Sequence, residues 1–317
     1  MDILVSSFGA ELSSMRKNGK EYLWQADPRF WKRHSPVLFP IVGSVWANHY
    51  RHQGTEYTLT QHGFARDMNF DKLSETADEV WFVLRDSEES RAKYPFAFEL
   101  KIGYRLHGHT VDVMWEVTNP SQETLHFQIG AHPAFFYPNY KYPATNAQNL
   151  AALGVAETAA SETTSEENPF TEATQRGYFS FDRSEGVQYI LISEKGCADP
   201  DTHYPLQLTD GLLPIDTHTF DRDALIIEEG QVKEVTLHDL QRKPVLKLRF
   251  EEAPLVGLWS PPGKNAPFLC IEPWYGRCDR AHYQGEYADK DWMQHLAAGA
   301  TFRGGYYIEI LEEQGDE

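Results

Sequence analysis

The sequence predicts an all-β protein, a large antiparallel β-sandwich with a few short helices. Apolar and polar residues alternate with a period of two in segments that recur along the whole chain. No long helical pattern alternates with these segments, as a parallel α/β sheet would require. Because no internal repeat and no linker rich in Pro, Gly or Ser divides the chain, we expect residues 1–317 to form a single domain.

The clearest pair of strands is predicted at residues 96–106 and 111–117. In the first segment every second residue is apolar, whereas Glu99 and Lys101 point to the opposite face. The second segment repeats the pattern after a turn at residues 106–109, which predicts a hairpin. The same criteria predict further strands at residues 22–24, 80–85, 125–131, 188–192, 232–237, 245–250 and 306–311.

Three shorter segments depart from the strand pattern. A helix is predicted at residues 289–298, because Trp292 and Leu296 lie four apart and a glycine follows as a stop. A second helix is predicted at residues 87–94. Residues 144–174 are rich in alanine, serine and threonine and contain no Lys or Arg. We expect a surface insertion there, mobile or partly helical, with a lid over a site as its functional alternative.

The charge balance limits the expected ligands. Lys and Arg number 29 against 47 Asp and Glu, which gives a formal net charge of −18. Nucleic acids and acidic membranes need a basic protein surface to neutralise their phosphates, so neither is an expected partner. We expect a neutral small molecule, or an anion compensated by local cations. A homodimer is left open as the assembly of the chain.

The sequence also predicts a cytoplasmic location. Residues 1–14 lack the basic start and the apolar run of a signal peptide, and no apolar stretch approaches the roughly 20 residues of a spanning helix. The cysteines Cys197, Cys270 and Cys278 show no C-x-x-C spacing. We therefore expect three buried, reduced thiols.

A motif search excludes several reaction classes. The sequence has no G-x-x-x-x-G-K-[ST], G-x-S-x-G or H-E-x-x-H, and no G-x-G-x-x-G after a strand. Two histidine pairs, His49/His52 and His107/His109, raise the question of a metal. The second pair lies in a predicted turn, where exposure explains it, and no carboxylate is spaced to complete a site. We expect no metal centre.

Two segments carry side chains suited to acid–base chemistry beside a constrained backbone. Residues 61–67 place His62 and Arg66 four apart, around a glycine that permits a sharp turn. Residues 267–276 place Glu272 after an apolar run and before a proline, which biases the glutamate to an extended conformation.

A third such segment covers residues 125–135. Its apolar residues share one strand face, so His126, Gln128 and, if the strand continues, His132 point to the other. Taken singly, each polar residue of the three segments has an ordinary explanation as a turn residue, a strand end or a salt-bridge partner. Their joint occurrence favours a functional site.

Together these segments resemble the aldose 1-epimerases, or galactose mutarotase-like proteins, and among them the subgroup related to LacX. The resemblance rests on HGFAR at residues 62–66, GAHPAF at residues 130–135 and PFLCIEPWYG at residues 267–276. One of these motifs alone would be weak, but the set in this order is specific. Further matching stretches lie at residues 8–12, 21–24, 36–43, 213–215, 220–226 and 257–260.

The resemblance implies a single large β-sandwich and an isomerase that interconverts the anomers of a hexose without a cofactor. In the family a glutamate takes the proton of the anomeric hydroxyl while a histidine protonates the ring oxygen. By motif, Glu272 is implied as the base and His132 as the acid, held as carboxylate and imidazolium. His62 matches a second histidine of the family site.

The resemblance and side-chain chemistry together indicate sugar contacts. Asp223 matches a family aspartate that binds sugar hydroxyls, with Asp216 and Asp221 as alternatives. Trp259 or Trp274 offers an aromatic face to the apolar side of a pyranose, with burial in the core as the alternative for each.

One stretch departs from the family pattern. Residues 43–48, GSVWAN, lack the arginine that better-known galactose mutarotases carry in this region. Other groups must then bind the sugar hydroxyls, and Arg66, Gln128 and Asp223 are the candidates. The departure concerns the identity of the substrate more than the reaction.

Two other functions stay open. A hexose-6-phosphate 1-epimerase needs a cationic clamp, for which Arg29, Lys32 and Arg33 are candidates, with a solvated charge cluster as the alternative. A non-catalytic carbohydrate-binding protein would share the fold. Glu272 and His132 argue against it, because a pure binder needs no paired acid and base.

Overall fold

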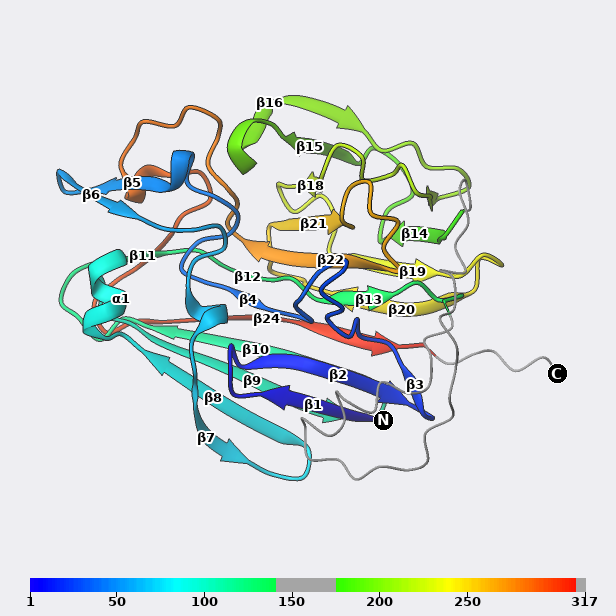
Figure 1. Ribbon diagram of the computed structural model, residues 1–317, viewed down its shortest axis with the longest axis horizontal. Helices are drawn as coiled ribbons and strands as arrows, with labels where there is room; N and C mark the ends of the chain where they lie inside the picture. Colours follow the sequence, from blue (N-terminus) through cyan, green and yellow to red (C-terminus); the bar gives the residue numbers. More distant parts are fainter. Residues whose placement is uncertain (141–174, 312–317) are drawn as a thin grey trace.

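Two large antiparallel sheets dominate the computed structural model, which describes residues 1–140 and 175–311 (Figure 1). The predicted all-β sandwich is confirmed. The surface insertion predicted at residues 144–174 lies outside the described residues.

The first sheet has nine strands. In spatial order they are β17 (Leu212–Ile215), β14 (Gly177–Phe181), β19 (Glu234–His238), β20 (Pro244–Arg249), β24 (Thr301–Ile310), β10 (Thr110–Thr118), β9 (Glu99–His107), β8 (Glu79–Arg85) and β7 (Asp71–Glu75).

The second sheet has eight strands. In order they are β16 (Ala198–Pro205), β15 (Gln188–Ile192), β18 (Leu225–Ile227), β21 (Leu255–Trp259), β22 (Phe268–Tyr275), β12 (Ile129–Ala131) and β4 (Val37–Leu38), and β13 (Ala134–Phe136) also pairs with β22.

Smaller elements surround the two sheets. Three strands form a separate sheet, β1 (Asp2–Ser6), β2 (Glu11–Lys17) and β3 (Lys20–Glu21), and two ribbons pair β5 (His49–His52) with β6 (Thr55–Thr58) and β11 (Leu125–Phe127) with β23 (Gln294–Leu296). Besides the helix α1 (Glu88–Lys93), there are 3₁₀ turns at Trp46–Asn48, Ala65–Asp67, Glu194–Gly196 and Tyr287–Asp289.

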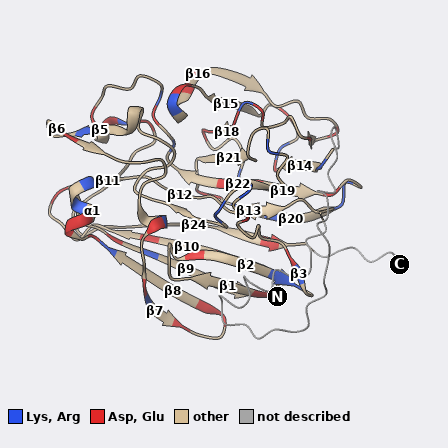
Figure 2. Ribbon diagram, viewed as in Figure 1, with Lys and Arg blue, Asp and Glu red and all other residues tan. Residues whose placement is uncertain are grey.

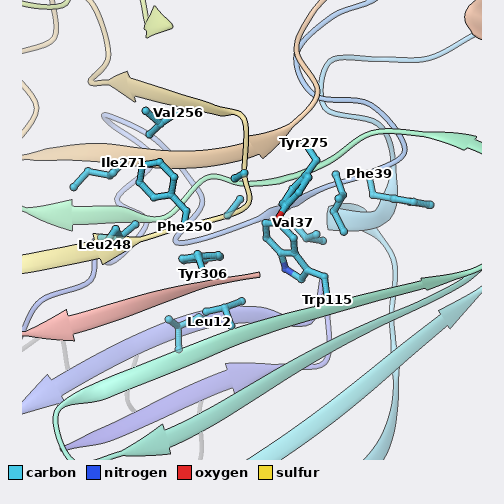
Figure 3. Packing of buried hydrophobic residues seen from close by; sticks show 14 of the residues in the cluster. Leu12, Val37, Phe39, Trp115, Leu248, Phe250, Val256, Ile271, Tyr275 and Tyr306 are labelled. Carbon is cyan, nitrogen blue, oxygen red and sulfur yellow. The ribbon is translucent and has the colours of Figure 1, made fainter. Parts of the chain in front are cut away.

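The main core lies between the two large sheets. Leu248 of β20 and Tyr306 of β24 belong to the same buried cluster as Val256 of β21 and Ile271 of β22 (Figure 3). These side chains are at most 2% exposed. Burial of apolar area at about 25 cal/mol per Å² makes this interface the main source of stability.

Most predicted elements are present. The predicted hairpin is β9 and β10, joined where His107 pairs with Thr110. The helix predicted at residues 87–94 is α1, and it begins at Ser87, whose hydroxyl accepts a hydrogen bond from the Ser90 N–H at 3.2 Å. The strand predicted at residues 125–131 is divided at Gln128, which belongs to neither β11 nor β12.

Two predictions were wrong. Residues 289–298 do not form a helix, because Trp292 has a positive φ of 61° and residues 294–296 pair with β11 as β23. The Trp292/Leu296 spacing is therefore overridden by tertiary pairing. The strand predicted at residues 22–24 is reduced to one bridge between Leu23 and Phe135.

Charged residues of both signs are distributed over the described part of the chain. Figure 2 shows acidic and basic segments interspersed over the two sheets. All three cysteines are buried and free, as the sequence predicted. Among the described residues, no helix is long and apolar enough to cross a membrane.

Candidate functional site

Strand β22 carries buried side chains on both of its faces. Leu269 and Ile271 point into the core between the large sheets, whereas the alternate residues Cys270, Glu272 and Trp274 point to the outer face of the eight-stranded sheet. Burying a carboxylate on this second face costs folding free energy unless the carboxylate has a partner, so its presence there indicates a function or a partner.

The pairing of β22 with β12 and β13 sets His132 opposite Glu272. Gly130 pairs with Trp274 and Ala134 pairs with Cys270, so the residue midway between them faces Glu272. The Nε2 atom of His132 lies 3.3 Å from Oε2 of Glu272. The two sequence motifs therefore meet through strand register.

A cavity of about 400 Å³ opens over this pair. Its volume lies within the usual range of small-molecule sites, roughly 300–1,000 Å³. Seven of the eight residues that the sequence nominated line it: His62, Arg66, His132, Asp223, Trp259, Glu272 and Trp274.

Gln128, predicted to contact a ligand, does not line the cavity. It is fully buried, and its side chain accepts a hydrogen bond from the Val42 N–H at 3.2 Å and donates one to the Asp291 carbonyl at 3.0 Å. Gln128 instead fixes the segment around Val42, which borders the cavity.

Aromatic rings enclose His132 on three sides. Trp31 stacks on the imidazole with ring centroids 4.7 Å apart, and Trp259 and His62 meet it edge to face at 5.4 and 5.5 Å. The imidazole Nδ1 and Glu272 Oε2 have no hydrogen-bond partner among the described residues. Such unpaired buried atoms are costly and indicate a place where a polar ligand binds.

Burial sets the protonation of the pair. Desolvation, with Asp223 nearby, raises the pKa of Glu272 well above its ordinary value, and desolvation, with Arg66 nearby, lowers the pKa of His132 to about 3. Both shifts favour the uncharged forms. We therefore expect the resting pair to hold one proton on the carboxyl, rather than to rest as carboxylate and imidazolium.

His62 is held in one orientation by its neighbours. Its Nδ1 accepts a hydrogen bond from the Gly43 N–H at 3.0 Å, so in the neutral ring the proton is on Nε2. Burial, Arg66 and His132 lower the pKa of His62 well below its ordinary value, which keeps the ring neutral. Gly63 has a φ of 68°, and a Cβ there would lie 2.3 Å from the Phe39 carbonyl oxygen, so the predicted sharp turn requires glycine.

Of the three candidate aspartates, only Asp223 lines this cavity. Its carboxylate accepts a hydrogen bond from the Ala224 N–H at 2.8 Å. Asp216 and Asp221 bond instead to His218 in an exposed turn.

Arg66 stands in the cavity in a restrained position. It donates a hydrogen bond to the Gln61 carbonyl at 2.6 Å. Its buried Nε lies 3.8 Å from the Asp67 carboxylate and has no hydrogen-bond partner among the described residues. Burial, with Arg33 nearby, lowers its pKa to about 10, so the guanidinium remains charged at neutral pH.

Trp274 forms part of the cavity wall by lying flat on the sheet. A Cβ at Gly257 would approach its ring to 2.4 Å and one at Gly130 to 2.6 Å, so two glycines make room for the indole. Its Nε1–H donates to the Ala131 carbonyl at 3.2 Å. The ring is therefore both packed in the sheet and part of the lining.

The structure adds cavity residues that the sequence reasoning missed. Trp31 is the main one, and Lys264 donates a hydrogen bond to the Phe30 carbonyl at 3.0 Å across the rim. Trp31 belongs to an aromatic and basic run, but no local pattern marks it as a neighbour of His132.

The proposed phosphate clamp is not at the cavity. Arg29, Lys32 and Arg33 are absent from its lining, and Arg29 and Arg33 pair with Asp27 and Asp67. The cations that do line the cavity are Arg66 and Lys264.

Sequence comparisons identify the family of the chain. Residues 1–304 match the family model described as aldose 1-epimerase. The plasmid-encoded protein LacX of Lactococcus lactis subsp. lactis is 28% identical over 321 residues, which cover 98% of this chain and 97% of the relative.

Solved structures share the fold. A galactose mutarotase related enzyme from Lactobacillus acidophilus is 32% identical with a TM-score of 0.82, and the match covers 98% of this chain and 94% of that one. A galactose mutarotase-like protein from Lactobacillus casei is 25% identical with a TM-score of 0.82, with coverage of 98% and 96%.

Proposed function

Because the chain belongs to the aldose 1-epimerase family, we propose that it interconverts the α and β anomers of a free hexose by acid–base opening of the ring. The observation that carries the proposal is the buried pair of Glu272 and His132, 3.3 Å apart at the wall of a cavity of sugar size. Anomers interconvert when one group removes the O1 proton and another protonates the ring oxygen.

In the proposed reaction Glu272 takes the proton from the anomeric O1 hydroxyl. The O1–H electron pair forms the carbonyl, the C1–O5 bond breaks, and His132 gives its proton to O5. Rotation about C1–C2 and closure by the reverse transfers give the other anomer, so the protein ends with its protons where they began.

This mechanism requires the shared proton to move from Glu272 to His132 before the ring opens. The atoms Oε2 and Nε2 are close enough for that transfer through a short shift. Hydrogen bonds from sugar hydroxyls stabilise the Glu272 carboxylate. The face of Trp31 stabilises the His132 imidazolium, so both contacts favour the charged forms.

The remaining lining residues suit a sugar. Trp31 and Trp259 offer aromatic faces to the apolar side of a pyranose, and His62 presents an Nε2–H to a ring or hydroxyl oxygen. Arg66 donates and Asp223 accepts hydrogen bonds, so both kinds of hydroxyl contact are provided.

Polarimetry of freshly dissolved α-galactose and α-glucose tests the proposal. Wild-type protein is expected to accelerate the change of rotation, and Glu272→Gln and His132→Ala are each expected to lose about 10²- to 10⁴-fold of the enzymatic rate. Glu185→Gln and His218→Ala, at exposed positions, are the matched controls. Activity that survives both site variants would overturn the assigned roles.

Polarimetry with a phosphorylated sugar, together with calorimetry, separates the competing functions. A faster reaction with glucose 6-phosphate than with glucose would favour a phosphorylated substrate despite the absence of Arg29, Lys32 and Arg33 from the lining. Sugar binding by calorimetry without acceleration from pH 5 to 9 would favour a non-catalytic binder.

A further inference from the structure

A third ligand-forming side chain stands beside the Glu272–His132 pair. One ring nitrogen of His132, the sulfur of Cys270 and a carboxylate oxygen of Glu272 all lie within 4.8 Å of one another. All three residues are buried. No other group of this kind is found among residues 1–140 and 175–311.

Strand geometry makes the cluster rigid. Cys270 and Glu272 are two apart on β22 and project from the same face, and Cys270 pairs with Ala134, two residues after His132. Cys270 is also held from the other side by pairing with Trp259 of β21. Cys270 and Glu272 therefore come from β22, and His132 comes from the short connection between β12 and β13, which both pair with β22.

The spacing suits a four-coordinate metal ion. Ligands bound to Zn²⁺ at about 2.0–2.3 Å in a tetrahedron stand roughly 3.3–3.8 Å from one another. The Nε2–Oε2 separation of 3.3 Å matches one edge, and the sulfur lies within 4.8 Å of one ring nitrogen and of one carboxylate oxygen. Imidazole, thiolate and carboxylate together are a ligand set for zinc and related thiophilic ions.

Two further features point to a ligand. Oε2 of Glu272 is buried with no hydrogen-bond partner in the described part of the chain, in a residue 2% exposed. His132 and Glu272 also line the cavity, so an ion reaches them from solvent and keeps a fourth position open toward the cavity.

We propose that His132, Cys270 and Glu272 form an inhibitory site for a thiophilic divalent cation such as Zn²⁺. Coordination releases the protons of the Cys270 thiol and the Glu272 carboxyl to solvent, and no electron is transferred. The ion occupies the base and the acid together, so it competes with the sugar. The inhibition rests on the proposed function, whereas the binding does not.

Cadmium titration tests the binding directly, because a Cd²⁺–thiolate bond adds an ultraviolet charge-transfer band. One equivalent of Cd²⁺ is expected to produce the band in wild type and in Cys278→Ala, and not in Cys270→Ala or Cys270→Ser. Cys278 is the matched control, since it is a buried free thiol that lines the same cavity outside the cluster. Absence of the band in wild type, or its persistence in both Cys270 variants, would overturn the site.

Polarimetry with Zn²⁺ tests the inhibition, each protein being compared with its own metal-free rate. Zn²⁺ is expected to inhibit wild type competitively with sugar, and a chelator to reverse it, while loss of a ligand in Cys270→Ala weakens inhibition by about tenfold or more. Equal inhibition of both proteins would contradict the proposal. A thiolate band in wild type without epimerase activity would leave the metal site standing and refute the proposed function instead.

Discussion

At the scale of single residues, burial decides the chemistry of this cavity. Glu272 is 2% exposed and His132 is 6% exposed. In water a glutamate is charged at neutral pH and about a quarter of histidine side chains are charged, whereas here desolvation opposes both charges. The pair is thus poised to share a single proton, which is the stoichiometry that an acid and a base working together require.

The pH dependence of kcat/KM follows from that shared proton. The one-proton state persists until His132 gains a second proton near its lowered pKa of about 3, or until pH rises through the raised pKa of Glu272. We expect a broad plateau through neutral pH, measured by polarimetry after subtraction of the spontaneous rate at each pH. Circular dichroism at each pH is the control for folding. An acid limb near pH 6.5, the ordinary pKa of histidine, would contradict the shared proton.

Sequence reasoning succeeded for residues that a backbone constraint marks. His62 beside Gly63 and Glu272 before Pro273 were both identified from local rules, and both line the cavity. It also nominated Gln128, whose side chain is absent from the cavity lining and is bonded to Val42 and Asp291 instead. Trp31 was missed because only tertiary contact brings its ring onto His132.

At the scale of elements, the interrupted ladder beside β22 makes the site. β12 and β13 pair with β22 in the same register, but strand pairing is interrupted between them. Pro133 and Pro273 lie there, and proline lacks the N–H that hydrogen bonding between strands needs. The sequence predicted a strand at residues 125–131, which contains β12, but it predicted neither β13 nor β22 as strands, nor which strands are neighbours. Register over such distances depends on the packing of whole sheets and leaves no local pattern.

A buried ion network connects Arg277, just after β22, to Glu228, just after β18, and to Asp291. The Arg277 guanidinium, 3% exposed, lies 2.9 Å from the Glu228 carboxylate and 2.8 Å from that of Asp291. Trp292 also donates to Glu228 at 3.3 Å. Each charge is tolerated in the interior only because the other is present.

Arg277→Met is therefore expected to lower the free energy of unfolding by about 3–5 kcal/mol, because it leaves the Glu228 charge buried and unpaired. Urea denaturation measures the loss. The double variant Arg277→Met with Glu228→Gln removes that charge and is expected to recover part of the stability. A double variant that is no more stable than Arg277→Met would show that the ion pair is not the cause.

At the scale of the whole molecule, the two faces of the eight-stranded sheet differ. One face packs on the nine-stranded sheet (Figure 1). The other carries Trp274 and its buried neighbours, several of which line the cavity. A carboxyl in this layer costs stability that a hydrophobic or neutral residue of the same size would not. The catalytic proposal thus predicts a conflict between stability and activity at Glu272.

That conflict depends on pH in a definite direction. The pKa of Glu272 is raised above its ordinary 4.5, so above that pH the native state retains a proton that an unfolded glutamate has lost, and ionisation of the carboxyl in water favours unfolding. Glu272→Gln removes the titrating carboxyl and with it this dependence of stability on pH. The free energy of unfolding of Glu272→Gln minus that of wild type should grow as pH rises from about 5 to 8, by at most about 1.4 kcal/mol per pH unit. Urea denaturation across this range measures it, with Glu185→Gln, at an exposed position, expected to give a constant difference. A Glu272→Gln difference that stays constant or shrinks with pH would mean that Glu272 is already ionised in the folded protein.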